Sequence, residues 1–556
     1  MRRLLFVLAL VHAVLIKVCA DECAAAPLFD ATANVPLCVA PGNQLYPAIV
    51  PDGAGGGIVV WTDGRGEFFD IYAHHVLASG VADPAWPVDG NIVCGAGGGQ
   101  LLPSMVSDGA GGAIVVWYDY RNGVGDVFAQ HLLASGAIDP VWPTDGLAIC
   151  TASGEQILPR AVTDGAGGAI VAWLDYRSRN RPELFFQRVR ATGEMDLAWP
   201  ADGLGIPSAS SPQPPAIVAD DEGGVLVAWQ DIREGGFGYD VRVQRVTGSG
   251  VIDPEWPSGG RVLGKISSQF SPQITSDGSG GCIVVWHYFV NGNFDIYSQR
   301  VLGSGFVDSV WPEGGRALCT ALGTQNYPTV VSDGAGGAIA VWQDQRAGSN
   351  WDIYAQRILG SGEVDPAWPS DGTPLCIATG DQRLPVIVSD GKGGAIVGWT
   401  DYRAGAGADI YALRVRSSGT VDPSWPMDGQ AVSRADGEQT QLVMVSGVRG
   451  GAIAAWVDQR TGAESDIYSK VSSRRSRHTR ETTRSWSASP GMEAGHLCDS
   501  TALSRRARSF HFDGQPGMCF SMTRPPPGRP AGSPLGPAKS CSRSARMQKP
   551  RGIPSG

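Results

Sequence analysis

The sequence lacks the short motifs by which many enzymes and metal proteins are recognised. It has no nucleophile elbow, no phosphate-binding loop and no zinc-ligand pattern. No CxxC pair or Cys/His cluster occurs among its 11 cysteines and 8 histidines. We therefore assign no catalytic residue, and we predict no cofactor and no metal site.

Long apolar segments are also missing beyond the N-terminus. The only long apolar run, Leu4–Ile16, is shorter than the roughly 20 residues that a membrane span needs. It follows Arg2 and Arg3 and ends in Val18-x-Ala20, which is the pattern of a secretory signal peptide. We predict cleavage after Ala20, no transmembrane segment in the mature chain, and a secreted or cell-surface protein. A lipoprotein anchor on Cys19 is the alternative, against which the preceding Lys17 argues.

What the sequence does contain is an eightfold repeat. An apolar-apolar-Trp motif returns every 56 or 57 residues, and Asp-x-Arg follows it in every repeat but one. A fixed period of this length indicates a repeat architecture. We interpret the repeated tryptophans as structural core residues: Trp61, Trp117, Trp173, Trp229, Trp286, Trp342, Trp399 and Trp456.

Each repeat has the pattern of four short strands. In the second repeat we expect them at Pro103–Ser107, Ala113–Asp119, Asp126–Ala134 and Leu147–Thr151. A glycine-rich hairpin turn joins the first two. The second strand is apolar at consecutive positions, which predicts burial of both its faces. The connection before the fourth strand is rich in proline, so we expect its Trp142 to pack as a plug over the sheet.

Four antiparallel strands per repeat with a doubly buried middle strand predict an all-β protein, a β-propeller of eight four-stranded blades. A segment resembling the fourth strand precedes the first full repeat, at Val35–Ala40, and the same strand is missing after the eighth. We therefore expect the N-terminal strand to complete the last blade and close the ring.

The cysteines do not indicate disulfides, even though export would allow them. Five of them occupy the same place in successive repeats, and equivalent positions on sheets about 10 Å apart are too distant for a disulfide. We expect buried free thiols at Cys38, Cys94, Cys150, Cys319 and Cys376.

The phrase DGxGGxIVVWxDxR…DIYAQR resembles the repeats of secreted bacterial β-propeller proteins, broadly akin to WD40-like and TolB-like propellers. The resemblance covers about residues 36–473. It implies the fold and says little about activity, because propellers host binding proteins, scaffolds, glycosidases and lyases.

The expected domains are a signal peptide at 1–20, a lead-in at 21–34, the propeller at 35–473 and a disordered tail at 474–556. The tail has no repeat and contains 15 Lys or Arg but only 4 Asp or Glu. Three readings stay open for it: a product of a frameshift or wrong gene assignment, a basic arm that binds polyanions, and a linker without function.

The residues repeated in every blade are interpreted as structural. We expect the Asp-x-Arg charges to fasten loops, and the Gln-x-x-Pro glutamines to bond to the backbone. The Asp-Gly-x-Gly-Gly turns lack the dense carboxylates of calcium loops.

We expect functional residues at positions where one repeat differs from the others, and in loops that carry aromatic residues. Repeat five replaces Asp-x-Arg by His287-Tyr288-Phe289-Val290, and Arg160 stands on an innermost strand where other repeats have uncharged residues. Aromatic loop residues alongside charged residues are suited to binding a sugar or a peptide. The candidate binding residues are His287, Tyr288, Arg160, Trp351, Tyr120 and Tyr176.

We predict an extracellular, non-catalytic binding or scaffold propeller whose ligand is a protein or a glycan. We expect a monomer, and no nucleic acid partner for the propeller. The alternative is a carbohydrate-active enzyme, a glycosidase or polysaccharide lyase on the same fold. A glycosidase needs two carboxylates at a set distance. No obvious pair stands outside the repeated positions, and the sialidase Asp-box is not matched by SDGAGGAIVVW.

Overall fold

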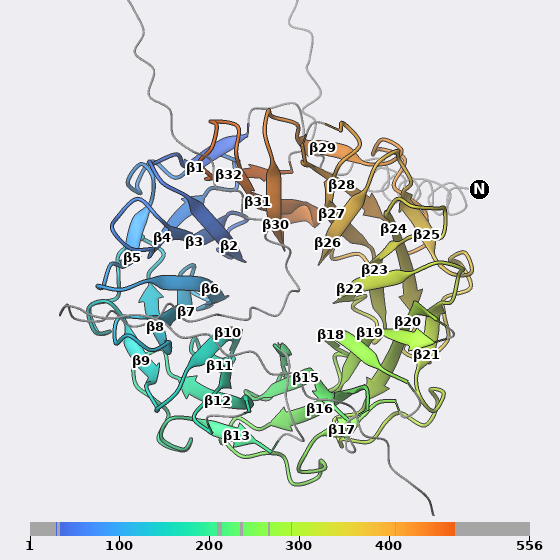
Figure 1. Ribbon diagram of the computed structural model, residues 1–556, viewed down its shortest axis with the longest axis horizontal. Coiled ribbons are helices and arrows are strands. Elements are labelled where there is room, and N and C mark those ends of the chain that lie inside the picture. Colours follow the sequence, from blue (N-terminus) through green and yellow to red (C-terminus); the bar gives the residue numbers. More distant parts are fainter. Residues whose placement is uncertain are drawn as a thin grey trace, which may run out of the picture. The chain divides into compact units, whose positions relative to one another are not determined.

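Eight four-stranded antiparallel sheets form a ring around a central opening (Figure 1). The computed structural model describes residues 29, 34–178, 181–207, 214–233, 237–264, 267–290, 292–405 and 407–472. All of them belong to one structural unit, Met1–Ser487. The expected signal peptide and tail lie outside the described residues. The predicted eight-bladed propeller is confirmed.

The strands repeat in the same order in every blade. The innermost strands are β2 (Gln44–Pro51), β6 (Gln100–Ser107), β10 (Gln156–Thr163), β14 (Ala216–Ala219), β18 (Gln269–Ser276), β22 (Gln325–Ser332), β26 (Gln382–Ser389) and β30 (Gln439–Ser446). The second strands are β3 (Gly57–Asp63), β7 (Ala113–Asp119), β11 (Ala169–Asp175), β15 (Val225–Ile232), β19 (Cys282–Val290), β23 (Ala338–Asp344), β27 (Ala395–Asp401) and β31 (Ala452–Asp458).

The third strands are β4 (Asp70–Val76), β8 (Asp126–Leu132), β12 (Glu183–Val189), β16 (Tyr239–Val246), β20 (Asn293–Val301), β24 (Asp352–Ile358), β28 (Asp409–Val415) and β32 (Asp466–Val471). The outermost strands are β5 (Asn91–Cys94), β9 (Leu147–Cys150), β13 (Leu204–Ile206), β17 (Arg261–Val262), β21 (Arg316–Cys319), β25 (Thr373–Cys376), β29 (Gln430–Ser433) and β1 (Val35–Cys38). The only helix in the described part of the chain is the short 3-10 turn η1 (Val448–Gly450), and no helix there is long and apolar enough to span a bilayer.

The ring closes as the strand count predicted. The last sheet has the order β1-β32-β31-β30, so the first strand of the chain is the outer strand of blade 8 (Figure 1). β1 pairs antiparallel to β32, with Val35 opposite Ser469 and Cys38 opposite Ile467. Backbone hydrogen bonds therefore join the two ends of the propeller.

The second strand of each blade forms the core. Every residue of β7 is buried, and the ring of Trp117 has no exposed surface. The other seven repeated tryptophans are equally buried. A strand covered on both faces needs apolar residues at consecutive positions, because each neighbouring blade packs on one face. This confirms the interpretation of the tryptophans as core residues.

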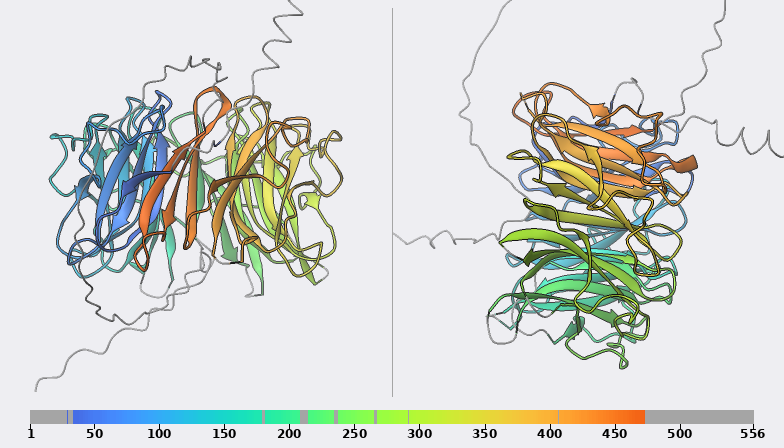
Figure 2. Two further views of the ribbon diagram at one scale, coloured as in Figure 1. Left: turned by 90° about the horizontal axis from the view of Figure 1, so that it is seen from above. Right: turned by 90° about the vertical axis from the view of Figure 1, so that its right-hand side faces the viewer.

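The loops gather on two opposite faces of the ring (Figure 2). We call upper the face where second strands turn into third strands and where outermost strands lead to the next innermost strand. The lower face carries the turns between first and second strands. On that face, Asp108 accepts hydrogen bonds from the amides of Ala110 and Gly112 at 2.7 and 2.8 Å. The Asp-Gly-x-Gly-Gly motif is thus a turn fastened by its own aspartate.

The tryptophan of the long connection packs between its own blade and the next one. Trp142 is buried, but its indole Nε1 donates to the carbonyl of Ala191 in the following blade. A Cβ added at Gly193 of that blade would lie 3.0 Å from the Trp142 ring. Trp142 also packs in a cluster with Val127 and Ala129 of its own blade. The predicted packing over the sheet is therefore confirmed, and the plug extends to the following blade.

The described cysteines are buried free thiols, as expected. Burial raises the pKa of each of the five repeated thiols to about 12. At neutral pH they are protonated and behave as small apolar side chains.

Candidate functional site

The Asp-x-Arg motif on the upper face fastens each blade internally. Asp119 accepts hydrogen bonds from Trp117 Nε1 at 2.7 Å and from Arg121 Nε and a terminal guanidinium nitrogen at 2.9 and 2.6 Å. The guanidinium also lies 3.9 Å from the centre of the Phe128 ring and donates to the carbonyl of Asp145. These contacts leave the pair a structural role, as the sequence predicted.

Blades 4 and 5 are the two that abandon this arrangement. In blade 4, Arg233 pairs with Asp240 at 2.6 Å. In blade 5, Tyr288 replaces the aspartate, and the hairpin of β19 and β20 extends until Val290 pairs with Asn293. The buried indole nitrogens of Trp229 and Trp286 have no hydrogen-bond partner, unlike those of the fastened blades.

Where the fastener is missing, aromatic side chains gather on the upper face. Phe270 stacks on His287 with ring centres 5.6 Å apart, and Phe294 meets the same imidazole edge-on at 5.0 Å. Phe289 and Tyr327 keep 41% and 39% of their surface exposed. We call this group the aromatic platform; it consists of Tyr239, Phe270, Phe289, Phe294 and Tyr327, from blades 4, 5 and 6.

His287 lies beneath this platform and is 7% exposed. In blades 1, 4 and 6 the residue at its position accepts a hydrogen bond from the backbone amide of a left-handed residue on the next blade, as Gln343 Oε1 does from Leu384 at 2.6 Å. The left-handed residue beside His287 is Tyr327, whose ring centre lies 6.1 Å from the imidazole. Yet Nδ1 of His287 is buried without a partner among the described residues.

Desolvation lowers the pKa of His287 to about 4. The imidazole is therefore neutral at pH 7, and its free nitrogen can donate or accept one proton. A buried polar atom without a partner costs about 1–3 kcal/mol. A histidine at this position therefore does not stabilise the contact between neighbouring blades.

The raised pKa of Asp295, a carboxyl group of blade 5, does not mark it as an acid–base partner of His287. Burial raises the pKa of Asp295 to about 6, with Asp371 adding to the shift. The equivalent Asp352 and Asp409 of blades 6 and 7 behave in the same way. The raised value therefore belongs to a strand position that blades 5, 6 and 7 share.

The structure does not gather the predicted site residues into one place. His287 and Tyr288 are buried in blade 5, and Tyr288 packs edge-on against Tyr297 at 5.0 Å. Tyr120, Tyr176 and Trp351 are half-buried in loops of blades 2, 3 and 6. The hydroxyl of Tyr118 donates a 2.5 Å hydrogen bond to the hydroxyl of Tyr120.

Sequence reasoning missed most of the platform. Phe270 and Tyr327 lie at the start of innermost strands, and Phe294 follows the loop of the atypical hairpin. Comparing each repeat column by column could have found them. Phe270 stands where other repeats have Leu45, Leu101, Ile157, Asn326, Arg383 or Thr440.

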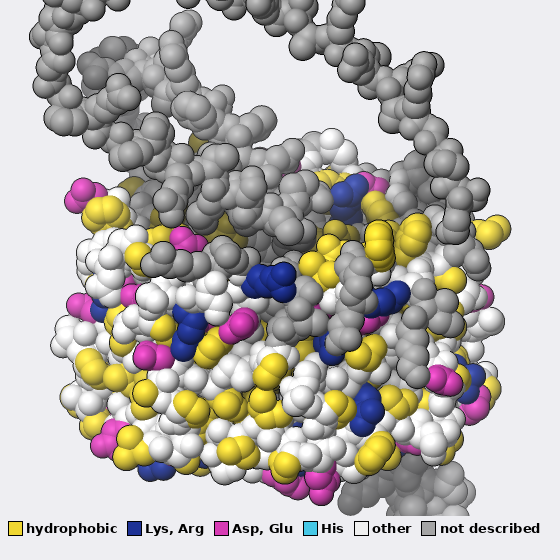
Figure 3. Space-filling model, turned by 60° about the horizontal axis from the view of Figure 1, so that its bottom comes forward, with side chains coloured by type: hydrophobic (Ala, Val, Ile, Leu, Met, Phe, Trp, Pro, Cys, Tyr) yellow, Lys and Arg dark blue, Asp and Glu magenta, His cyan; other side chains and the backbone are white. Residues whose placement is uncertain are grey.

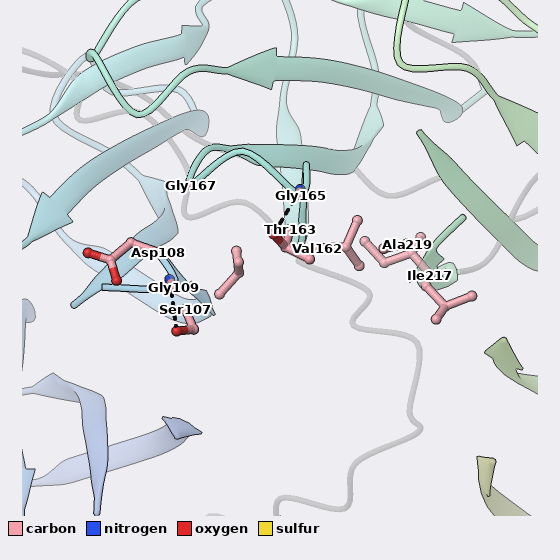
Figure 4. A pocket seen from close by; sticks show the side chains of 11 residues that line it. Ser107, Asp108, Gly109, Val162, Thr163, Gly165, Gly167, Ile217 and Ala219 are labelled. Atoms are coloured by element: carbon pink, nitrogen blue, oxygen red, sulfur yellow. Dashed lines mark hydrogen bonds between the residues drawn. The ribbon is translucent and has the colours of Figure 1, made fainter. Parts of the chain in front are cut away.

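A cavity of about 580 Å³ opens near the lower face beside the innermost strands of blades 2 to 4 (Figure 4). Ser107 and Thr163 lie at its rim, where their hydroxyl groups accept the amides of Gly109 and Gly165. Ile217 and neighbouring valines form apolar walls. No group of three metal-ligating side chains occurs among the residues that the structure describes.

The outer surface adds no strongly charged region on the side seen in Figure 3. Acidic and basic side chains are interspersed there with apolar ones. That side therefore carries no broad field of one sign.

No protein-family model and no curated protein matches this sequence. Several solved structures are similar. One is the polysaccharide lyase PL25 ulvanlyase bound to a GlcA(1-4)Rha3S saccharide, with 11% identity, a TM-score of 0.45, and coverage of 80% of this chain and 96% of that one. Another is the α-L-arabinanase of Penicillium chrysogenum complexed with arabinobiose, with 12% identity, a TM-score of 0.33, and coverage of 57% and 92%. A third is a sialidase, Hadza microbial sialidase Hz136, with 13% identity, a TM-score of 0.32, and coverage of 54% and 63%.

These neighbours correct the main functional prediction. The preference for a non-catalytic binding or scaffold propeller is wrong, because the similar structures with a printed activity are carbohydrate-active enzymes, which was the alternative. At such low identity and TM-score, no substrate or residue role passes from them to this chain. An argument about chemistry has to come from the chain's own side chains.

Proposed function

We propose that this chain is a carbohydrate-active enzyme that cleaves a polysaccharide lying across the aromatic platform. The observation that carries the proposal is the neutral, buried His287, whose Nδ1 has no partner among the described residues and which lies beneath the aromatic platform with its exposed Phe289 and Tyr327. Aromatic faces bind the apolar faces of sugar rings, and a few polar groups in an apolar setting fix orientation. Histidine is the side chain that enzymes use most often for proton transfer to or from a reacting group.

Between the two classes of enzyme, this site favours a polysaccharide lyase. A glycosidase uses two carboxyl groups flanking the bond. Asp295 is 5% exposed and resembles its counterparts in other blades, so it does not stand out as one of such a pair. Elimination instead needs one base that takes the proton from C5, the carbon next to a carboxylate, and a neutral imidazole suits this role. The electron pair left on C5 forms the C4–C5 double bond as the C4–O bond breaks, and the leaving oxygen takes a proton from the imidazolium or from water.

A panel of neutral and acidic polysaccharides offered to the full chain tests the proposal. A lyase produces an unsaturated sugar that absorbs in the ultraviolet, whereas a glycosidase produces only new reducing ends. We expect His287→Gln to lower kcat about 100-fold or more and Phe294→Ala to raise KM. Thr400→Ala is the matched control, because Thr400 follows the core tryptophan of blade 7 and is also buried. Undiminished cleavage by His287→Gln would refute the role of the imidazole.

We also propose export through the segment 1–20, a glycan partner, and a grouping with secreted bacterial WD40-like or TolB-like propellers. The n-region, apolar run and Val18-x-Ala20 exit support export. N-terminal sequencing of protein from the culture medium should then begin at Asp21. Recovery of the intact N-terminus inside the cells would contradict export.

A further inference from the structure

Arg160 is the only charged residue at its position in the eight innermost strands. Its equivalents, read from the pairing with each second strand, are Ala48, Ser104, Ala216, Gln273, Thr329, Val386 and Val443. The side chain is exposed, and β10 borders the central opening. No hydrogen bond or ion pair joins it to any described residue.

No charged neighbour accounts for the presence of Arg160. No carboxylate contributes to the pKa of its guanidinium, and arginine keeps its proton in proteins, so the side chain is a cation. The arginines of the Asp-x-Arg motifs and of the third strands, in contrast, each lie near a carboxylate, as Arg300 lies 2.8 Å from Asp277. A cation that is exposed beside the channel and has no carboxylate partner can bind an anion.

Arg160 lies beside the lower cavity. Side chains alternate along a strand, so Arg160 and Val162 project on the same side of β10, about 7 Å apart. Val162 lines the cavity, as do Thr163 on the same strand, Ser107 on β6 and Ile217 on β14 (Figure 4). Arg160 is not one of the residues that line the cavity, but an extended arginine side chain is long enough to span that distance to a ligand bound there.

We infer that the central channel contains an anion-binding site for an acidic sugar, with Arg160 as the anchor for a carboxylate or sulfate and the lower cavity as the seat of the sugar ring. The guanidinium presents two parallel N–H donors that fit either oxyanion. Hydroxyl groups of Ser107 and Thr163 face a ligand that carries hydroxyls, and the apolar wall suits the apolar face of a pyranose. The cavity volume falls within the range of about 300–1,000 Å³ that small-molecule sites occupy.

This site is separate from the aromatic platform on the upper face, so it does not depend on the proposed catalysis. Calorimetric titration of the full chain at low ionic strength tests it with glucuronate, a glucose sulfate ester, glucose and inorganic sulfate. We expect glucuronate or the sulfate ester to bind, glucose to bind at least about ten-fold more weakly, and added salt to weaken the binding.

Variants separate the anchor from a general charge effect. Arg160→Gln should weaken binding about ten-fold or more, and Arg160→Lys should restore part of it. Arg383→Gln is the matched control, because Arg383 also lies on an innermost strand but is paired with Asp381 at 2.6 Å. It should bind like the unmodified chain, and so should His287→Gln.

Three results would overturn the inference: equal binding of glucose and glucuronate, unchanged binding by Arg160→Gln, or inorganic sulfate binding as tightly as the acidic sugars. Equally tight binding of inorganic sulfate would mean that the site holds an adventitious ion only. Loss of cleavage in His287→Gln with intact glucuronate binding separates this inference from the proposed function.

Discussion

At the scale of single residues, the core indoles are equally buried but differ in whether the N–H group has a hydrogen-bond acceptor. Trp117 has one, since Asp119 accepts its Nε1–H, whereas the nitrogen of Trp286 has no partner. Phenylalanine removes the indole N–H in either blade, but only Trp117→Phe also removes a hydrogen bond to a carboxylate. We expect Trp117→Phe to lower the free energy of unfolding by about 1–3 kcal/mol more than Trp286→Phe. Urea denaturation of both variants measures this, and equal losses would contradict the fastener.

The raised carboxyl pKa values make stability depend on pH in a defined direction. Burial raises the pKa of Asp352 to about 6 from an ordinary 3.8. Between these values the folded state binds more protons than the unfolded state, so stability falls as pH rises towards 6 and stays low above it. Asp352→Asn should therefore be more stable than the unmodified chain by about 1–3 kcal/mol at pH 8, and the difference should shrink towards pH 4. Thermal unfolding at both pH values checks this; an advantage that grows at low pH would contradict it.

At the scale of elements, the second strand of each blade was predictable and the innermost strand was not. Consecutive apolar residues gave Ala113–Asp119 its correct bounds. The innermost strand begins three residues earlier than expected, at Gln100, because a bulge bends it between Leu101 and Ser104. Leu102 adopts a left-handed conformation there, with φ 54°. Leucine and proline around a bulge carry no local sign of positive φ, so only the assembled blade reveals it.

The ring-closing strand β1 is the element on which the closed fold depends. Leu37 is 2% exposed and packs in a cluster with Val59 and Trp61 of blade 1 and Val457 and Ile467 of blade 8. A carboxylate at this place would be buried without a partner. Leu37→Asp should cost about 4 kcal/mol or more in unfolding free energy. The exposed Val39→Asp, two residues along the chain, is the control and should cost far less. Equal stability of the two variants would show that β1 contributes little.

At the scale of the whole molecule, repetition explains why the fold was easier to predict than the site. The strand pattern of any one repeat is ambiguous, but eight copies of it can be compared. The number of blades and the closure of the ring were therefore predicted by counting repeats and strands. A site built from residues that differ from the repeat occurs once, so no other copy of the pattern helps to predict it. His287 was visible as a departure, but its neighbours Phe270 and Tyr327 come from two innermost strands more than 50 residues apart. Only the packing of blade 5 against blade 6 brings them to the same imidazole.

Because β1 closes the ring from the N-terminal end of the chain, we predict that the same strand could also be supplied from the C-terminal end. In blades 1 to 7 the outermost strand follows the third strand, and blade 8 differs only in taking β1 from the N-terminus. A second copy of residues 34–41, inserted after Ser472 through a copy of the connection 77–90, would supply the same strand from the C-terminal side. In the Leu37→Asp background this insertion should restore most of the lost unfolding free energy, because the added Leu regains the pocket between blades 8 and 1. The same insertion with its own leucine changed to Asp is the control and should restore nothing. Equal stability with and without the inserted leucine would mean that closure does not depend on this strand pairing.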